Sequence, residues 1–253
     1  RHYDKNFQSL YGDGFAESGT VNEQGIYYGM KYKFNPKWEL SAYYDKFRYP
    51  WLRSSLDMVG GQGDEYLARL FYKPKRGTSI YFQHKNETKH RNLIDNETRL
   101  DFAVPSTKQT QILNIDTKAS SKISLKSRVQ WSYFEQEGRD REFGYMLFQD
   151  VNFNFGKYRL SARYAIFDTE GSNNRMYTYE KDVLYAYSIY SFSGTGVRKY
   201  LVFRYTPIRR LDFWVKYART TFNMEPNATI GSSTEEIQGN VRSDIRIQMR
   251  YKF

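Results

Sequence analysis

The chain has 253 residues, of which 18% are aromatic, with a formal net charge of +11 and a mean hydropathy of −0.79. It has no cysteine and three histidines, which excludes disulfides and thiolate metal sites and argues against a histidine-rich metal site. No apolar run approaches the roughly 18 residues that a membrane helix needs, so helical insertion is excluded, whereas insertion by strands needs only alternate apolar residues.

Apolar and polar residues alternate in successive segments, which is the period of a β-strand. We interpret residues 1–23 as a loop that follows an upstream strand, and residues 86–107 are too polar to assign. The predicted strands, in chain order, are Gly25–Phe34, Trp38–Tyr49, Tyr66–Tyr72, Ile80–Phe82, Gln109–Thr117, Ile123–Glu135, Phe143–Phe155, Tyr158–Ile166, Val197–Thr206, Leu211–Tyr217 and Glu236–Phe253.

The connections between these strands alternate in length. Turns of about two to four residues near positions 35, 75, 120, 156 and 208 alternate with long loops near 55, 95, 139, 180 and 229. Transmembrane β-barrels segregate short turns and long loops in this way, and a soluble sandwich has no reason to do so. The sequence therefore predicts an all-β fold, a transmembrane antiparallel up-and-down β-barrel that occupies residues 1–253 as a single region. We expect Val183–Phe192, in the loop between residues 168 and 196, to extend a neighbouring strand above the membrane.

The final strand alternates without a break over Ile245–Phe253. A last strand that ends in phenylalanine resembles the closing strand of bacterial outer-membrane barrels, in which a C-terminal aromatic belongs to the signal for the assembly machinery. Tyr251 and Phe253 are the candidate signal residues, although a strand of a soluble sheet also alternates. Counting back from Phe253 gives about eleven crossings, and because bacterial barrels have an even strand number, we expect upstream strands from the same or another chain.

Several phrases resemble the C-terminal part of a family of large outer-membrane proteins of Bacteroidota. They are Phe47–Arg53, Tyr164–Thr169, Tyr179–Tyr185 and Trp214–Thr220, together with the opening Arg1–Phe7. Members of that family carry an N-terminal helix-hairpin-helix domain similar to competence DNA-binding proteins. The resemblance implies the outer membrane of a diderm bacterium, with its lipid and its barrel-assembly machinery as partners. The residues printed here do not include the helix-hairpin-helix part, and it is to that part that the resemblance assigns a DNA role.

If the apolar face of each strand contacts lipid, the basic residues of the opposite face line the lumen. The facing acids, such as Glu39, Glu65, Asp150, Asp212 and Asp244, are fewer, so the lumen is expected to favour anions. The alternative is that the bases pair with these acids and with an internal plug, which gives a packed polar interior. The candidate lumen-lining residues are Lys31, Lys33, Arg69, Lys73, Lys126, Arg128, Arg159, Arg163, Arg198, Arg204, Lys216, Arg242, Arg246, Arg250 and Lys252.

The acidic residues of one long loop raise the question of a metal. Asp168, Glu170, Glu180 and Asp182 supply the oxygen ligands of a hard-cation site if they meet, but we prefer to interpret them as part of a solvated charged loop. The prediction is therefore no metal and no cofactor.

Catalytic residues are not evident. Ser193 has no local partner for nucleophilic catalysis, and His2, His84 and His90 lie in dispersed polar contexts. The sequence gives no triad, and we expect no enzymatic activity, with an outer-membrane hydrolase as the alternative.

Three functions follow from these patterns. The first is a non-enzymatic outer-membrane barrel that serves as a pore, a transport conduit or a scaffold of an envelope complex, and the second is a barrel component of a nucleic-acid uptake system. Nucleic-acid binding needs basic residues beside exposed aromatic side chains on which the nucleobases stack. Here the basic and the aromatic residues mostly occupy opposite faces of the strands, which disfavours nucleic-acid binding by the strands. The third function is the hydrolase.

Overall fold

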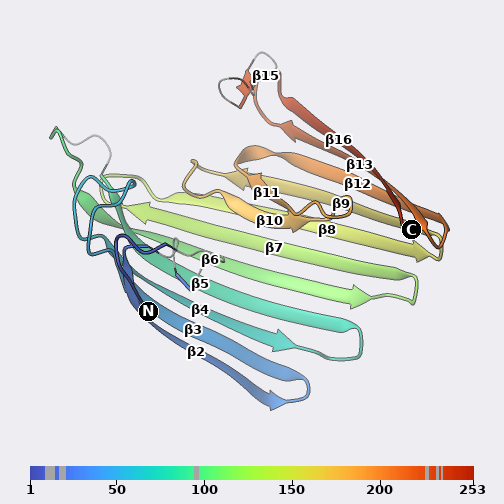
Figure 1. The fold of residues 1–253 in the computed structure, drawn as a ribbon, viewed down its shortest axis with the longest axis horizontal. Coiled ribbons are helices and arrows are strands. Elements are labelled where there is room, and N and C mark those ends of the chain that lie inside the picture. Colours follow the sequence, from blue (N-terminus) through green and yellow to red (C-terminus); the bar gives the residue numbers. More distant parts are fainter. Residues whose placement is uncertain (9–14, 17–20, 94–96, 226–227, 232–233, 235) are drawn as a thin grey trace. The chain divides into compact units, whose positions relative to one another are not determined.

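The computed structural model describes residues 1–8, 15–16, 21–93, 97–225, 228–231, 234 and 236–253 (Figure 1). Within these ranges no helix is long and apolar enough to cross a membrane. The strands are β1 (His2–Tyr3), β2 (Glu23–Asn35), β3 (Trp38–Arg48), β4 (Gln62–Tyr72), β5 (Thr78–Asn92), β6 (Ala103–Lys118), β7 (Ile123–Gln136), β8 (Glu142–Phe155), β9 (Tyr158–Thr169), β10 (Met176–Glu180), β11 (Ser188–Phe192), β12 (Gly194–Ile208), β13 (Leu211–Phe222), β14 (Thr229–Ile230), β15 (Ile237–Gln238) and β16 (Val241–Tyr251).

Twelve of these strands form one sheet, in the order β1-β2-β3-β4-β5-β6-β7-β8-β9-β12-β13-β16. The order follows the chain except where the pairs β10–β11 and β14–β15 are inserted, and each of these pairs is a separate two-stranded sheet. The prediction of an all-β antiparallel up-and-down fold is confirmed, and every predicted strand is present. Two compact units make up the chain, one of Arg1–Tyr72, Phe82–Gln111 and Ser132–Glu142, the other of Lys73–Tyr81, Ile112–Trp131 and Phe143–Phe253.

In the first unit, β2, β3 and β4 pair in antiparallel register, for example Tyr28 with Tyr44 and Tyr44 with Tyr66. The alternation of the sequence places one side chain in two on an exposed face, and β2 contributes five that are 56–68% exposed. The opposite face carries charges, where Arg1 contacts Glu23 and Asp45. The exposed apolar side chains of β2 are Ile26, Tyr28, Met30, Tyr32 and Phe34.

In the second unit, β8, β9, β12, β13 and β16 lie side by side (Figure 1). One face of these strands, here called the apolar face, exposes hydrophobic side chains; the other, the charged face, buries polar and charged ones. The exposed set includes Leu147, Tyr164, Ile166, Leu201, Phe203, Phe213, Val215, Tyr217, Ile245, Ile247 and Met249. The buried polar set on the opposite face includes Asp150, Arg163, Arg198, Asp212, Lys216 and Thr220.

Short turns close one end of these strands, here called the turn end. Gly156 has a φ of 68°, a conformation that glycine adopts at no steric cost, and it begins the turn between β8 and β9. Arg209 and Arg210 separate β12 from β13. At the other end of the strands, here called the loop end, the inserted pairs β10–β11 and β14–β15 leave and rejoin the sheet.

The segment that gave no assignment, residues 86–107, contains strand. β5 continues to Asn92 and β6 begins at Ala103. Charges replace apolar side chains in this part of β5, because Glu87 forms ion pairs with Lys85 and Lys89 and so satisfies the half-buried groups.

Two further expectations need correction. Val183–Phe192 does not extend a neighbouring strand: β11 pairs with β10 alone. The last strand runs only from Val241 to Tyr251, because residues 237–238 pair with β14. Within the expected loop 1–23, His2 and Tyr3 pair with β2, while residues 9–14 and 17–20 lie outside the described residues.

Candidate functional site

The hairpin β10–β11 packs on the charged face of the second unit, across β8 and β9 (Figure 1). Its two strands alternate, so Met176 of β10 and Phe192 of β11 point to the sheet. They join a fully buried cluster to which the sheet contributes Met146 and Phe148 of β8 and Ala165 and Phe167 of β9. Burial of one such side chain contributes about 1.5–3 kcal/mol to stability. The cluster therefore fixes to the sheet the end of the hairpin at which Met176 and Phe192 lie.

Glu180, the last residue of β10, binds two cations of the sheet. Arg198 of β12 donates two hydrogen bonds to its carboxylate, at 2.7 and 2.9 Å, and the Lys216 ammonium lies 3.4 Å from it. The exposed fractions of the three side chains are 1–3%. Arg198 also stacks on the Tyr190 ring of β11, with its Cζ 3.6 Å from the ring centroid. Because a buried ion pair is stable only when its partners and hydrogen bonds are complete, this arrangement holds the hairpin in one position.

Asp182, in the link between β10 and β11, extends the same network. Lys216 of β13 donates to its carboxylate at 2.9 Å, Arg246 of β16 donates at 2.7 Å, and the Ser188 hydroxyl donates as well. Burial opposes the charged form of Asp182, but the hydrogen bonds from Ser188 and Lys216 outweigh it, so the pKa of this carboxyl lies below its usual range. Glu180 and Asp182 together connect the hairpin to three strands of the sheet.

Arg163 of β9 makes the third connection. Its guanidinium donates two hydrogen bonds to Asp150 of β8, at 2.5 and 2.7 Å, and a third to the backbone carbonyl of Tyr179 at 2.9 Å. From the hairpin side, the Lys181 ammonium reaches Asn152 of β8 at 2.5 Å. The hairpin is therefore held by β8, β9, β12, β13 and β16.

Nearer the turn end, Asp212 of β13 collects two arginines. Arg204 donates at 2.7 Å and Arg250 at 2.5 Å, while the Thr206 hydroxyl donates at 2.7 Å. The guanidinium groups of Arg204 and Arg250 lie over the Trp214 ring, with Cζ 5.1 and 5.4 Å from its centroid. Asp212 therefore pairs both arginines, and Arg250 is also hydrogen-bonded to Tyr185 in the link between β10 and β11.

The other predicted lumen residues have varied surroundings. Lys31 pairs with Glu39 at 3.0 Å, Arg69 donates to Gln83 at 2.7 Å, and Arg128 donates to Asn114 at 3.1 Å and to the Tyr81 hydroxyl at 2.9 Å. Arg242 lies 3.9 Å from Asp244. Lys33, Arg159 and Lys252 are exposed, and Lys126 is half-buried beside a cavity that also contains Lys181. That these residues line an aqueous lumen stays a prediction.

The acidic residues that were weighed as ligands of a hard cation have other partners. Asp168 accepts a hydrogen bond from Thr195 at 2.6 Å and Glu170 accepts the N–H of Phe143 at 2.7 Å, while Glu180 and Asp182 pair with cations. No group of three or more potential metal ligands occurs among the described residues. Arg and Lys thus satisfy Glu180 and Asp182, while a hydroxyl and a backbone N–H bind Asp168 and Glu170, so these contacts give no support to the alternative of a hard-cation site.

At the C-terminus, the rings of Tyr251 and Phe253 form an edge contact with centroids 5.2 Å apart. Both side chains are exposed, and their role as an assembly signal stays a prediction.

Sequence reasoning missed the hairpin contacts Tyr190, Thr220 and Phe192. Tyr190 and Thr220 share a hydrogen bond of 2.9 Å. The alternation Met176-Tyr177-Thr178-Tyr179-Glu180 was a local signal of a strand inside the loop. No pattern in one sequence shows onto which surface such a strand folds.

The fold is thus an antiparallel all-β sheet that carries a packed hairpin on its charged face. No family model matches the chain, and no curated protein matches it; the resemblance to Bacteroidota proteins stays a prediction.

Among solved structures, the chain is similar to a KdgM porin in complex with disordered oligogalacturonate, with 13% identity, a TM-score of 0.33, and coverage of 91% of this chain and 96% of that one. It is also similar to a FadL homologue of Pseudomonas aeruginosa, with 11% identity, a TM-score of 0.42, and coverage of 90% of this chain and 66% of that one. Likeness at this level assigns neither a solute nor a mechanism to the chain.

Proposed function

We propose that the chain forms the wall of an outer-membrane β-barrel, a non-enzymatic transport conduit whose interior is closed by the β10–β11 hairpin. The observation that carries this proposal is the set of ion pairs by which Glu180 and Asp182 of the hairpin segment bind cations of the sheet. The pairs with Arg198 of β12 and Lys216 of β13 are buried, and Arg246 of β16 adds a half-exposed one. It combines two expectations that the sequence left as alternatives, namely a basic interior and an internal plug.

The two faces of the sheet support a membrane setting. Ile245, Ile247 and Met249 of β16 are 64–77% exposed, and their neighbours on β13 and β12 continue the same hydrophobic surface. Soluble monomers rarely expose a contiguous apolar surface of this kind. A membrane barrel does so by design, with alternate residues facing lipid and the interior.

The pairing of charges supports a closed resting state. Arg198 and Lys216 are each 3% exposed and lie against Glu180. Cations that line an open aqueous channel would instead be hydrated and would gain little from such a partner. Displacement of the hairpin would uncover Arg198 and Lys216 and would remove the Asp182 carboxylate from Arg246. The opened conduit would then present a positive wall, which favours anionic solutes.

Planar-bilayer recording of the full-length protein tests this proposal through the double variant Glu180→Gln/Asp182→Asn. Loss of one partner of a buried ion pair costs about 3–5 kcal/mol, so the hairpin should detach, with more frequent and larger openings that pass anions over cations. The matched control is Asp168→Asn/Glu170→Gln, which removes the same number of charges at positions whose partners are a hydroxyl and a backbone N–H. It should behave as the wild type.

Two results would contradict the proposal. A protein that never inserts into the bilayer would remove the membrane wall. Conductance that is equal in the wild type and in Glu180→Gln/Asp182→Asn would remove the plug.

A further inference from the structure

A pair of cations lies on the apolar face of the second unit, directly above the hydrophobic part of β12 and β13. Lys199 of β12 and Arg219 of β13 are opposite each other in the register, and both are exposed. They lie on the loop-end side of most of the apolar residues of these two strands, and on this face of β12 Val197 lies nearer the loop end. The apolar residues below them are Leu201, Phe203 and Tyr205 on β12 and Leu211, Phe213, Val215 and Tyr217 on β13.

This pair is electrostatically unfavourable on its own. Like charges directly opposite each other on neighbouring strands destabilise a sheet. Within the described part of the chain, neither Lys199 nor Arg219 lies at ion-pairing distance from a carboxylate; Lys199 lies beside Tyr164, with its Nζ 5.9 Å from the ring centroid. The adjacent residue of β16 in the register of Arg219 is Ser243, which is neutral. An anion between the two cations would remove the repulsion.

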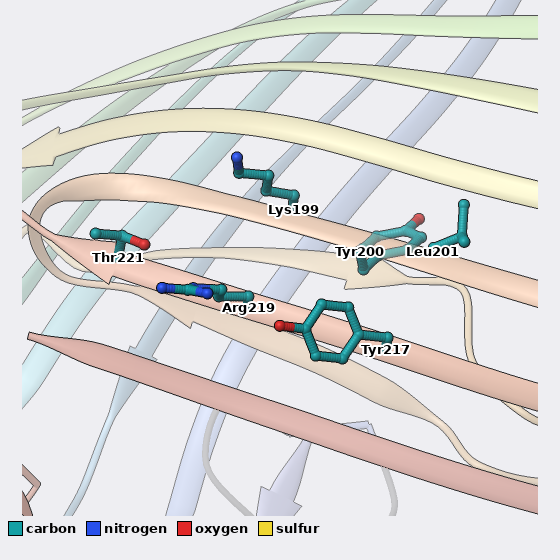
Figure 2. A pocket seen from close by; sticks show the side chains of 6 residues that line it. All are labelled: Lys199, Tyr200, Leu201, Tyr217, Arg219 and Thr221. Atoms are coloured by element: carbon teal, nitrogen blue, oxygen red, sulfur yellow. The ribbon is translucent and has the colours of Figure 1, made fainter.

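The surroundings of the pair match a ligand that is part anionic and part apolar. Lys199, Leu201, Tyr217, Arg219 and Thr221 line an open cavity of about 560 Å³, shown in Figure 2. The Tyr217 hydroxyl points along β13 toward Arg219 and is hydrogen-bonded to the side chains of Arg219 and Ser243. Hydroxyl and cationic donors therefore meet beside the hydrophobic side chains of the apolar face.

We infer that Lys199 and Arg219 bind the phosphate group of a membrane-lipid headgroup whose acyl chains lie along the apolar face below. The inference rests on the proposed membrane setting, because the acyl chains need that face to be in lipid. Guanidinium and ammonium groups are the usual partners of phosphate, and an aromatic ring with a polar tip is typical of the membrane interface. With short turns on the periplasmic side, the site belongs to the outer leaflet.

Native mass spectrometry of the detergent-solubilised protein tests this inference, with a phosphate-bearing anionic lipid as one probe and a phosphate-free diacylglycerol, which should not be retained, as the other. The wild type should retain the phosphate-bearing lipid. Lys199→Gln/Arg219→Gln should bind it roughly 30-fold less tightly, since each cation near a lipid surface contributes about fivefold. The control Arg209→Gln/Arg210→Gln removes the same charge from the turn end of the same two strands and should retain the lipid.

A charge reversal separates binding from structure. Lys199→Glu should abolish lipid retention and, because it replaces a repulsive pair by an attractive one, should raise the melting temperature in detergent free of such lipid. The proposed site would be refuted if Lys199→Gln/Arg219→Gln and Arg209→Gln/Arg210→Gln lowered lipid retention equally. It would also be refuted if an equal concentration of inorganic phosphate displaced the lipid.

These outcomes do not depend on the plug or on conductance. If Lys199→Gln/Arg219→Gln inserts into bilayers and conducts as the wild type does, the proposed function stands, whatever the result of the lipid experiment. Failure of every variant and of the wild type to insert would instead refute the membrane setting itself.

Discussion

At the scale of single residues, the hairpin depends on the charge of Asp182. Its carboxylate is fully buried and accepts hydrogen bonds from Lys216, Arg246 and Ser188. The pKa of Asp182 is lowered, so its stabilising effect is complete above the unfolded value of about 3.9 and is lost as the pH falls through the lower folded value. The hairpin should therefore stay closed from neutral pH down to about pH 4.

The measurement is the frequency of channel opening as a function of pH. Openings should increase only below about pH 4, and Asp182→Asn should open already at neutral pH. An increase that begins near pH 6.5, the usual range of histidine, would show that another group controls the hairpin.

At the scale of elements, the sequence predicted the strands well and the hairpin poorly. Ile123–Glu135 and Phe143–Phe155 alternate so regularly that their bounds nearly equal those of β7 and β8, because every second residue must be apolar where a face meets lipid. The part of β5 beyond Gln83 was not predicted, since ion pairs rather than apolar residues line it. The docking of β10–β11 on the sheet was not predicted, because its partners, such as Arg198 and Thr220, are distant in sequence from Glu180 and Tyr190.

The apolar anchor of the hairpin gives a prediction at this scale. Phe192 is fully buried against Phe167 and Met176, and replacement of a buried phenylalanine by alanine costs about 3–5 kcal/mol. Phe192→Ala should increase hydrogen exchange of β10 and β11 while the exchange of β9 and β12 stays as in the wild type.

The control for this experiment is Tyr187→Ala, in the link between the two hairpin strands, where the side chain is 78% exposed. It should leave the exchange of β10 and β11 unchanged. Equal protection of the hairpin in Phe192→Ala and in the wild type would show that the ion pairs alone hold it.

At the scale of the whole molecule, the central claim is that the two faces of the second unit meet different media. The claim rests on alternation along β13 and β16, where Val215 pairs with Ile247 on the apolar face and Trp214 pairs with Gln248 on the charged face. Adjacent residues of one strand should therefore differ completely in their surroundings. The chain has no cysteine, so single cysteines can be introduced and labelled without a background.

The most direct measurement is the fluorescence of an environment-sensitive label on Ile247→Cys and on Gln248→Cys, in vesicles with and without a quencher confined to the acyl chains. The label at position 247 should be quenched, and the label at position 248 should not be. Equal quenching at both positions, or none at either, would contradict a membrane wall with one lipid-facing and one interior face.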